Sequence, residues 1–193
     1  GMPEYKRARY LGRVYQDPMM GTSAGMEIEE NLALAVRRGK RHTLRLGIRR
    51  SEREDYRRRL KELGLGLEDR LTTKVGTLSG GQRQALTLLM ATLQQPKLLL
   101  LDEHTAALDP QTAARVMELT DRLVQENHLT TLMITHNMRD AIRYGNRLLM
   151  LHNGRIVLDI SGEEKSRLTV ADLMDMFRKV SGREYDNDRT LLA

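Results

Sequence analysis

One apolar run constrains the fold of this chain most strongly. Leu98–Leu101 consists of four consecutive leucines and is followed directly by the acidic pair Asp102-Glu103. A short apolar run that ends at charged residues is typical of a parallel strand buried on both faces. Thr130–Thr135 is a second buried-strand candidate and Tyr10–Tyr15 a third, with helical patterns between them. This alternation of strands and helices predicts an α/β chain.

Helical patterns dominate the chain between the strand candidates Tyr10–Tyr15 and Leu98–Leu101. Arg49–Leu63 is a strongly charged helix candidate, and a further helix begins at Ser79 and runs to Gln95. Ser79 is a good N-cap, because Gln82 stands at the capping-box position three residues later. We therefore expect a helical subdomain over residues 27–95, inserted in an α/β body.

The remaining residues divide around this insertion. We expect a partial core over 3–26, a continuation of the core over 96–177, and a polar tail over 178–193. Within the continuation, helices are predicted at Thr112–Asn127 and Asn137–Tyr144, and a last helix capped by Thr169 or Asp172 runs through Phe177. An Asn-Gly pair between two apolar runs predicts a β-hairpin at Arg147–Leu158.

The net charge of +6 comes from one segment. Arg37–Lys61 holds twelve Lys and Arg residues and three acids, a balance of +9, whereas the rest of the chain has 20 bases and 23 acids, a balance of −3. A general nucleic-acid binder is expected to have basic residues interleaved with aromatics, and aromatic residues are only 4% of this chain, so we expect no nucleic acid as a partner. The segment is either a solvated helix face or a contact for anionic lipid or a membrane partner.

Cysteine and histidine exclude some classes of site. The chain has no cysteine, which excludes disulfides and thiolate metal sites and fits a cytosolic protein. Its five histidines are not spaced as zinc ligands. No apolar run approaches the roughly 18 residues of a membrane span, and no signal peptide is visible.

Two acids follow the leucine run at the point where ligands bind in open α/β sheets. Asp102 in this position can hold Mg²⁺ directly or through water, and Glu103 can orient or deprotonate an attacking water. The alternative is a strand that simply ends in a solvated acidic turn.

A second motif, Ser79-Gly80-Gly81-Gln82, opens a helix 23 residues before Asp102. Backbone N–H groups at a helix N-terminus bind anions, and glycines let a ligand approach closely. The alternative is an ordinary glycine-rich loop with a serine cap. The spacing of one helix and a turn before the acids favours the anion site.

Two polar residues at other strand ends complete the candidates. His136 follows the second buried strand and could reach a γ-phosphate, although a single histidine is more often structural. Gln16 ends the first strand and could orient water or a metal ion, although it could equally be a loop residue. The phosphate-binding motif G-x-x-x-x-G-K-[ST] does not occur in these 193 residues, and the nearest string, Gly39–Thr43, does not match it.

These motifs, in this order, resemble the ATP-binding subunit of an ABC transporter. The resemblance covers nearly the whole chain to about Phe177. The matching motifs are the signature Leu78–Gln82, the Walker B strand Leu98–Asp102, the catalytic glutamate Glu103, the D-loop Ala107–Asp109, the switch histidine His136 and the Q-loop glutamine Gln16. Three stretches, Gln16–Pro18, Glu29–Ala35 and Asp102–Pro110, also resemble an importer subgroup labelled as tryptophan/tyrosine uptake, and His104 fits that subgroup.

The resemblance implies a function and partners. It implies ATP and Mg²⁺ as cofactors and hydrolysis by water, with Glu103 as base, Asp102 and Gln16 near Mg²⁺, and His136 on the γ-phosphate. ATP bound to a second ATPase subunit in a head-to-tail dimer would be contacted by Ser79, Gly80, Gly81, Gln82 and Asp109. Transmembrane permease subunits would contact the Q-loop region and the helical subdomain, and an extracytoplasmic solute-binding protein would act indirectly. The subunit would be cytoplasmic and peripheral on the inner face of the cell membrane.

The sequence departs from this family in one respect. The family carries a longer N-terminal portion with the phosphate-binding loop, so we expect a partial P-loop NTPase core without its Walker A strand, from a truncated form or a misassigned gene start. Loss of that strand should expose apolar surface on Thr130–Thr135 and favour a domain-swapped oligomer. We expect no ATPase activity from this chain alone.

Two other functions remain open. One is a non-transport ABC ATPase associated with nucleic acid or the ribosome, although the long coiled-coil inserts or paired cassettes of those proteins are absent. The other is a natural half-protein that acts as a regulator.

Overall fold

The computed structural model describes residues 1–40 and 47–179, so the predicted polar tail lies almost wholly outside the described residues. The chain forms two compact units, the first over residues 1–134 and the second from Thr135 onward. The predicted boundaries near residues 26, 95 and 177 stay predictions.

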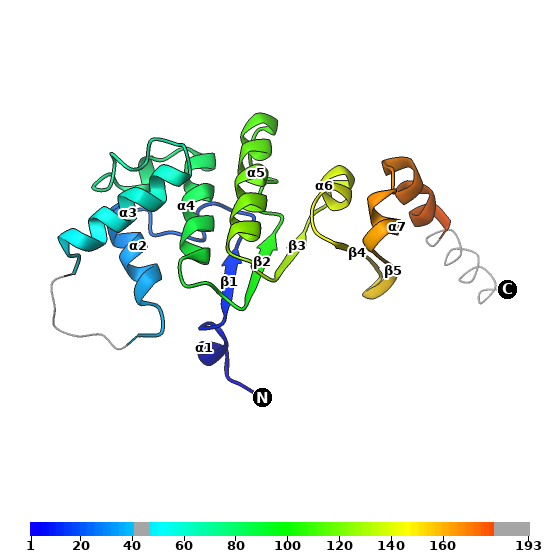
Figure 1. The fold of residues 1–193 in the computed structure, drawn as a ribbon, viewed down its shortest axis with the longest axis horizontal. Coiled ribbons are helices and arrows are strands. Elements are labelled where there is room, and N and C mark those ends of the chain that lie inside the picture. The colour runs from blue at the N-terminus through cyan, green and yellow to red at the C-terminus, as the bar shows by residue number, and fades with distance from the viewer. Residues whose placement is uncertain (41–46, 180–193) are drawn as a thin grey trace. The chain divides into compact units, whose positions relative to one another are not determined.

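The first unit is built on three parallel strands, as the leucine run predicts. They are β1 (Leu11–Val14), β2 (Leu98–Asp102) and β3 (Thr131–Ile134), in the order β1-β2-β3. Figure 1 shows them side by side. The register sets Val14 opposite Leu101 and Leu101 opposite Met133, so the three strands end at one edge. Side chains that follow these ends are therefore brought close together.

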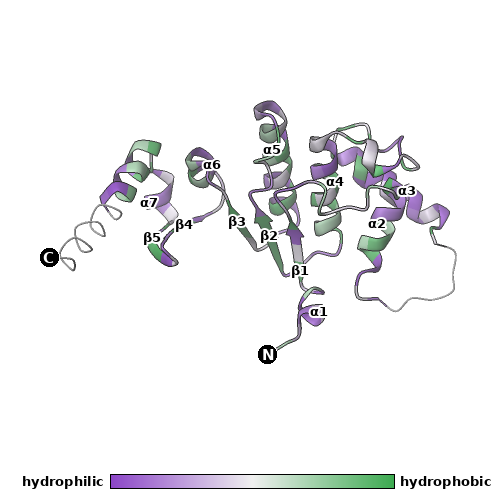
Figure 2. Cartoon of the chain, turned by 180° about the vertical axis from the view of Figure 1, so that it is seen from behind, coloured by the Kyte–Doolittle hydropathy of each residue, from purple (hydrophilic) through white to green (hydrophobic). Residues whose placement is uncertain are grey.

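The two faces of this sheet differ. Val14, Leu99 and Leu101 are fully buried on one face. On the other face Leu132 is 50% and Ile134 53% exposed, and Figure 2 shows β2 and β3 as hydrophobic. None of the four β3 residues is buried, because Thr131 and Met133 are half-buried and the other two exposed, so the prediction of a buried strand at Thr130–Thr135 is wrong. The exposed apolar side chains match the expectation that this strand carries exposed apolar surface.

Four helical elements lie between β1 and β2 in the described part of this stretch, as the helical patterns predict. They are α2 (Ile28–Arg37), α3 (Arg50–Glu62), the short 3₁₀ helix η1 (Val75–Thr77) and α4 (Gly80–Thr92). The start of α2 is fixed by a capping box in which Glu27 and Glu30 bond each other's backbone N–H groups. A short helix, α1 (Glu4–Arg7), precedes the sheet.

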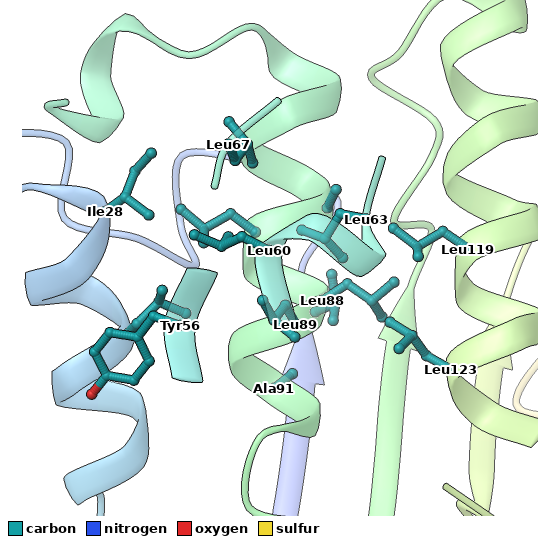
Figure 3. Packing of buried hydrophobic residues seen from close by; sticks show 14 of the residues in the cluster. Ile28, Tyr56, Leu60, Leu63, Leu67, Leu88, Leu89, Ala91, Leu119 and Leu123 are labelled. Carbon is teal, nitrogen blue, oxygen red and sulfur yellow. The ribbon is translucent and has the colours of Figure 1, made fainter. Parts of the chain in front are cut away.

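The core of the first unit lies between these helices and the sheet. Tyr56 and Leu60 of α3 are buried against residues of α2 and α4, and Figure 3 shows Leu88 and Leu89 between them and α5. β1 packs so closely on α4 that a Cβ on Gly12 would lie 2.6 Å from the Ala91 carbonyl oxygen. The helix α4 therefore joins the helical elements to the sheet.

The long helix α5 (Pro110–Glu126) lies beside α4 (Figure 1). It begins two residues earlier than predicted, because Asp109 caps it and Pro110 occupies the first position, where a proline costs no hydrogen bond. Conversely, α4 ends at Thr92 rather than Gln95, since Gln95 has a left-handed φ of 46° and Pro96 follows.

Five of the ten Lys and Arg residues in the described part of Arg37–Lys61 form ion pairs with acids. Arg37 pairs with Glu52, and Arg53 forms two hydrogen bonds with the buried carboxylate of Glu29. Asp55 pairs with both Arg58 and Arg59. These pairs support the interpretation of a solvated helix face. Residues 41–46 lie outside the described residues.

The second unit contains the predicted hairpin. Its elements are α6 (Met138–Arg143), β4 (Arg147–His152), β5 (Arg155–Ser161) and α7 (Gly162–Ser166), with helical residues at 170–179. Asn153 and Gly154 have φ values of 47° and 74°, as a two-residue hairpin turn requires. Thr169 and Asp172 form the predicted cap of the last helix. Across both units, no helix among the described residues is long and apolar enough to cross a membrane.

Candidate functional site

The acidic pair lies at the carboxyl edge of the sheet. Asp102 is the last residue of β2, and Glu103 leaves the strand with a left-handed φ of 43°. The Glu103 N–H donates to the Ile134 carbonyl at 3.0 Å, and the Glu103 carbonyl accepts from the Ala106 N–H at 2.9 Å. A non-glycine residue in this region is held there by its surroundings, at a cost of about 1–3 kcal/mol. Such strain is common where a side chain must take a fixed direction at a functional site.

Gln16 lies at the same edge. Val14, the last residue of β1, pairs with Leu101 of β2. Gln16 comes two residues after Val14 and Glu103 two residues after Leu101, so both follow the strands at the same level. The preceding carbonyl, of Tyr15, accepts a hydrogen bond of 2.9 Å from Gln84 Nε2. Gln84 is fully buried in α4, so the start of the loop that carries Gln16 is anchored to the signature helix.

Asp102 has a partner that the sequence does not suggest. Arg13 Nη2 lies 3.0 Å from Asp102 Oδ2, and the two side chains are 50% and 40% exposed. The Arg13 guanidinium also lies over the Tyr15 ring, 4.5 Å from its centroid. A cation therefore already sits beside the carboxylate predicted to bind Mg²⁺.

The signature opens α4 as predicted. Ser79 Oγ accepts from the Gln82 N–H, and Gln82 Oε1 accepts from the Ser79 N–H, both at 3.2 Å. The Ser79 hydroxyl only accepts in this pair of hydrogen bonds, so its own proton can be donated to another acceptor. Among the described residues, no hydrogen bond is made by the Gly80 or Gly81 N–H, as expected for the first turn of a helix. These donors are suited to an anion such as a phosphate.

The two glycines have different packing. A Cβ on Gly80 would lie 3.3 Å from Leu108 Cδ2, whereas a Cβ on Gly81 would lie 2.2 Å from Thr112 Cγ2. The second contact is far inside van der Waals distance. Gly81 is thus explained by the close packing of α4 on α5, a role that sequence reasoning did not assign to it.

Asp109 is joined to the signature through the same threonine. Its Oδ1 accepts from the Thr112 N–H at 3.1 Å, and the hydrogen bonds from Thr112 lower the pKa of the Asp109 carboxyl. Thr112 therefore touches both Asp109 and the helix that begins at Ser79. The structure thus brings Asp109 and the start of the signature helix together, and their predicted common role in binding ATP stays a prediction.

His104 is a site residue that sequence reasoning left without a role. It is buried directly after Glu103, and its Nε2 lies 3.0 Å from Thr120 Oγ1 of α5. The Thr120 hydroxyl donates to the Val116 carbonyl, so its oxygen is left to accept from His104 Nε2–H. Burial lowers the pKa of His104 to about 4, so the ring is neutral at physiological pH. In the sequence, His104 is recognisable only as a histidine that directly follows the two acids and precedes the amphipathic helix at Thr112–Asn127.

His136 belongs to the second unit. It precedes Asn137, whose side chain caps α6 by accepting from the N–H groups of Arg139 and Asp140. Its predicted role on a γ-phosphate stays a prediction.

The donor set suits Mg²⁺ only in part. Asp102, Glu103 and Gln16 offer carboxylate and amide oxygens, which hard cations prefer. Within residues 1–40 and 47–179, no group of three or more histidine, aspartate or glutamate side chains converges as a metal site. Mg²⁺ needs six ligands, so water or phosphate oxygens would have to complete its coordination. The site fits a metal–phosphate complex better than a bare ion.

Comparison with known proteins identifies the family. The family model described as ABC transporter matches residues 4–106. The tyrosine transport ATP-binding protein of Clostridioides difficile (strain R20291) is 48% identical over 176 residues, which make up 91% of this chain and 70% of that protein. The chain belongs to the ABC transporter family. The resemblance inferred from the motifs is thereby confirmed.

Other relatives match over a smaller part. An aliphatic sulfonates import ATP-binding protein of Paraburkholderia xenovorans (strain LB400) is 44% identical over 59% of this chain, but this chain spans only 33% of that protein. Among solved structures, the dimeric ATP-binding cassette MJ0796, in a post-hydrolysis state bound to ADP and Pi, has a TM-score of 0.65 at 26% identity. That match covers 81% of this chain and 65% of the other. A third likeness, to cbiO1 from Clostridium perfringens, has a TM-score of 0.67 at 22% identity and supports the fold. Together they confirm the predicted ABC ATPase fold.

Proposed function

We propose that this ABC transporter chain supplies the signature half of an ATP-hydrolysing importer subunit. The observation that carries the proposal is the link between its two motifs. Thr112 contacts both Asp109 and Gly81, so the D-loop and the start of the signature helix are packed on each other. Two motifs packed in this way can respond together to a nucleotide bound at their surface.

Each site residue then has a proposed task. Asp102 and Gln16 would hold Mg²⁺, which when bound neutralises charge on the phosphates. Glu103 would accept the proton of an attacking water, and its backbone is held at the end of the strand by hydrogen bonds to Ile134 and Ala106. His136 would contact the γ-phosphate. ATP held by a second, head-to-tail subunit would be bound by the N–H groups of Gly80 and Gly81 together with Ser79, Gln82 and Asp109.

The loop after Gln16 is the proposed contact for a permease subunit. Met19 and Met20 in this loop and Leu34 of α2 are exposed apolar side chains, which suit a protein partner. The helix α4 contacts the same loop at two places. Arg83 bonds Met19, and Thr87 packs on Gly21, where a Cβ would lie 2.2 Å from its methyl group. Displacement of this loop by a permease would therefore be passed to the signature helix.

The names of the relatives suggest the solute and the location. One relative is named for tyrosine transport and others for sulfonate import, and the first covers most of this chain. We therefore favour an aromatic amino acid delivered by an extracytoplasmic binding protein. The subunit would lie on the inner face of the cell membrane.

The chain by itself would not hydrolyse ATP. Its 193 residues contain no G-x-x-x-x-G-K-[ST] motif, and the described donors can hold only part of a metal–triphosphate complex. Its active form would be a site shared with a subunit that carries that motif.

Complementation tests this proposal. A full-length ABC ATPase subunit that retains its phosphate-binding loop but has a disabled signature is mixed with this chain, and Mg-ATP hydrolysis is followed by phosphate release. The wild-type chain should restore hydrolysis, and Ser79→Arg should not, because the arginine fills the anion site. Ser51→Arg, on the exposed start of α3, is the matched control and should restore hydrolysis fully. Restoration by the Ser79→Arg chain would refute the proposal.

A further inference from the structure

Arg13 is held beside the proposed metal ligand by the sheet itself. Arg13 pairs with Leu100 in the register of β1 and β2, and Asp102 is two residues further along on the same face. The contact between Arg13 Nη2 and Asp102 Oδ2, 3.0 Å long, therefore joins two strand residues rather than two loops. Diagonal neighbours on one sheet face are within reach of long side chains, so the strand pairing fixes this ion pair.

A second contact keeps the guanidinium at this place. Tyr15 directly follows the end of β1, two residues after Arg13, and the guanidinium carbon is 4.5 Å from the centroid of its ring. A guanidinium over an aromatic ring is attracted to the face of that ring. Arg13 is thus positioned at the sheet edge by a contact that does not depend on Asp102.

We propose that Arg13 is a positioning residue that competes with a divalent cation for the Asp102 carboxylate. The inference rests on the proposed role of Asp102 as a metal ligand. A guanidinium and a metal ion both need the carboxylate oxygens, and two cations a few ångströms apart repel each other. A bare metal ion must therefore displace Arg13, whereas a metal bound to phosphate brings negative charge that can pair with the released guanidinium.

The expected size of this competition is modest. Both side chains are about half exposed, and water screens such pairs. Removal of the Arg13 charge should tighten divalent-cation binding by about two- to tenfold, the range expected for one partly screened charge.

The second unit offers a matched control. Arg147 and Asp159 form a similar pair on a two-stranded sheet, 2.6 Å long, with side chains 60% and 45% exposed. No predicted site residue takes part in it. Arg147→Gln therefore removes the same charge from a similar environment without touching the proposed site.

The test is a Mn²⁺ titration of the full chain followed by electron paramagnetic resonance of the free ion, with no nucleotide present. Mn²⁺ takes the same oxygen ligands as Mg²⁺. Arg13→Gln should bind Mn²⁺ about two- to tenfold more tightly than the wild type, and Asp102→Asn should abolish that gain in the double variant. Arg147→Gln should match the wild type. Arg13→Lys keeps the charge and should retain most of the competition.

The failures can be told apart. If Asp102→Asn weakens Mn²⁺ binding but Arg13→Gln leaves it unchanged, the metal site stands and the role of Arg13 is refuted. If Asp102→Asn changes nothing in either background, Asp102 does not bind the bare ion and the inference about Arg13 is refuted, whereas the proposed function, in which phosphate completes the coordination, is tested separately by the complementation experiment. Circular dichroism of each variant confirms that the fold is retained.

Discussion

Burial of His104 makes the stability of the first unit depend on pH. The ring is almost fully buried between the acidic pair and α5, and burial lowers its pKa from the ordinary 6.5 to about 4. The unfolded chain therefore binds a proton at a higher pH than the folded chain does. The stabilisation is fully present above pH 6.5 and is lost as the pH falls from there toward 4.

The magnitude follows from the two pKa values. A difference of one pKa unit corresponds to about 1.4 kcal/mol, so the whole window is worth about 3 kcal/mol. Most of it is lost between about pH 6.5 and about pH 5, where the unfolded histidine becomes protonated and the folded one is still neutral. Acidification from about pH 7.5 to about pH 5 should thus cost about 2 kcal/mol through His104 alone.

Urea unfolding followed by circular dichroism at these two pH values measures the effect. Other groups also titrate, so the useful quantity is the difference between the wild type and His104→Gln, whose amide can still donate to Thr120. The wild type should lose about 2 kcal/mol more than the variant on acidification. His128→Asn, a change at an exposed histidine with a left-handed φ that asparagine tolerates, should behave like the wild type. Equal losses in the wild type and His104→Gln would refute the reasoning.

Three further substitutions probe the packing of the first unit. Gly81→Ala should cost about 1–3 kcal/mol, because its Cβ would lie 2.2 Å from Thr112 Cγ2, and Thr112→Ser should restore most of the loss in urea unfolding. Gln84→Leu should cost about 1–2 kcal/mol, since it leaves the Tyr15 carbonyl without its donor, and should speed hydrogen exchange in the loop after Gln16. Unchanged exchange there would contradict the anchoring role of Gln84. Arg53→Ala should lower the urea midpoint by leaving the Glu29 carboxylate buried and unpaired, and Glu29→Gln should reverse much of that loss, an outcome that a purely exposed pair would not give.

Local patterns predicted the elements of this fold because the signals for them are local. The leucine run at 98–101 marks β2, the Asn153-Gly154 pair marks the hairpin, and Ser79 with Gln82 marks the start of α4. Errors at helix ends came from single residues. The predicted end at Gln95 missed the left-handed backbone before Pro96, and the predicted start at Thr112 missed the cap by Asp109.

The contacts that shape the site could not be predicted, because they join residues that only the fold brings together. Arg13 and Asp102 are 89 residues apart, and their pairing depends on the register of β1 and β2. The role of Gly81 depends on Thr112 of another helix, and the burial of His104 depends on Thr120. A sequence motif identifies the residues of such a site, but the packing that positions them depends on residues from the rest of the folded unit.

A calorimetric titration of the purified chain with Mg-ATP tests the central claim most directly, namely that these residues form half of a shared nucleotide site. The account predicts no saturable heat at millimolar Mg-ATP for the chain alone. Saturable binding by the chain alone that Asp102→Asn removes would contradict the account, because the described residues would then hold the nucleotide without a second subunit.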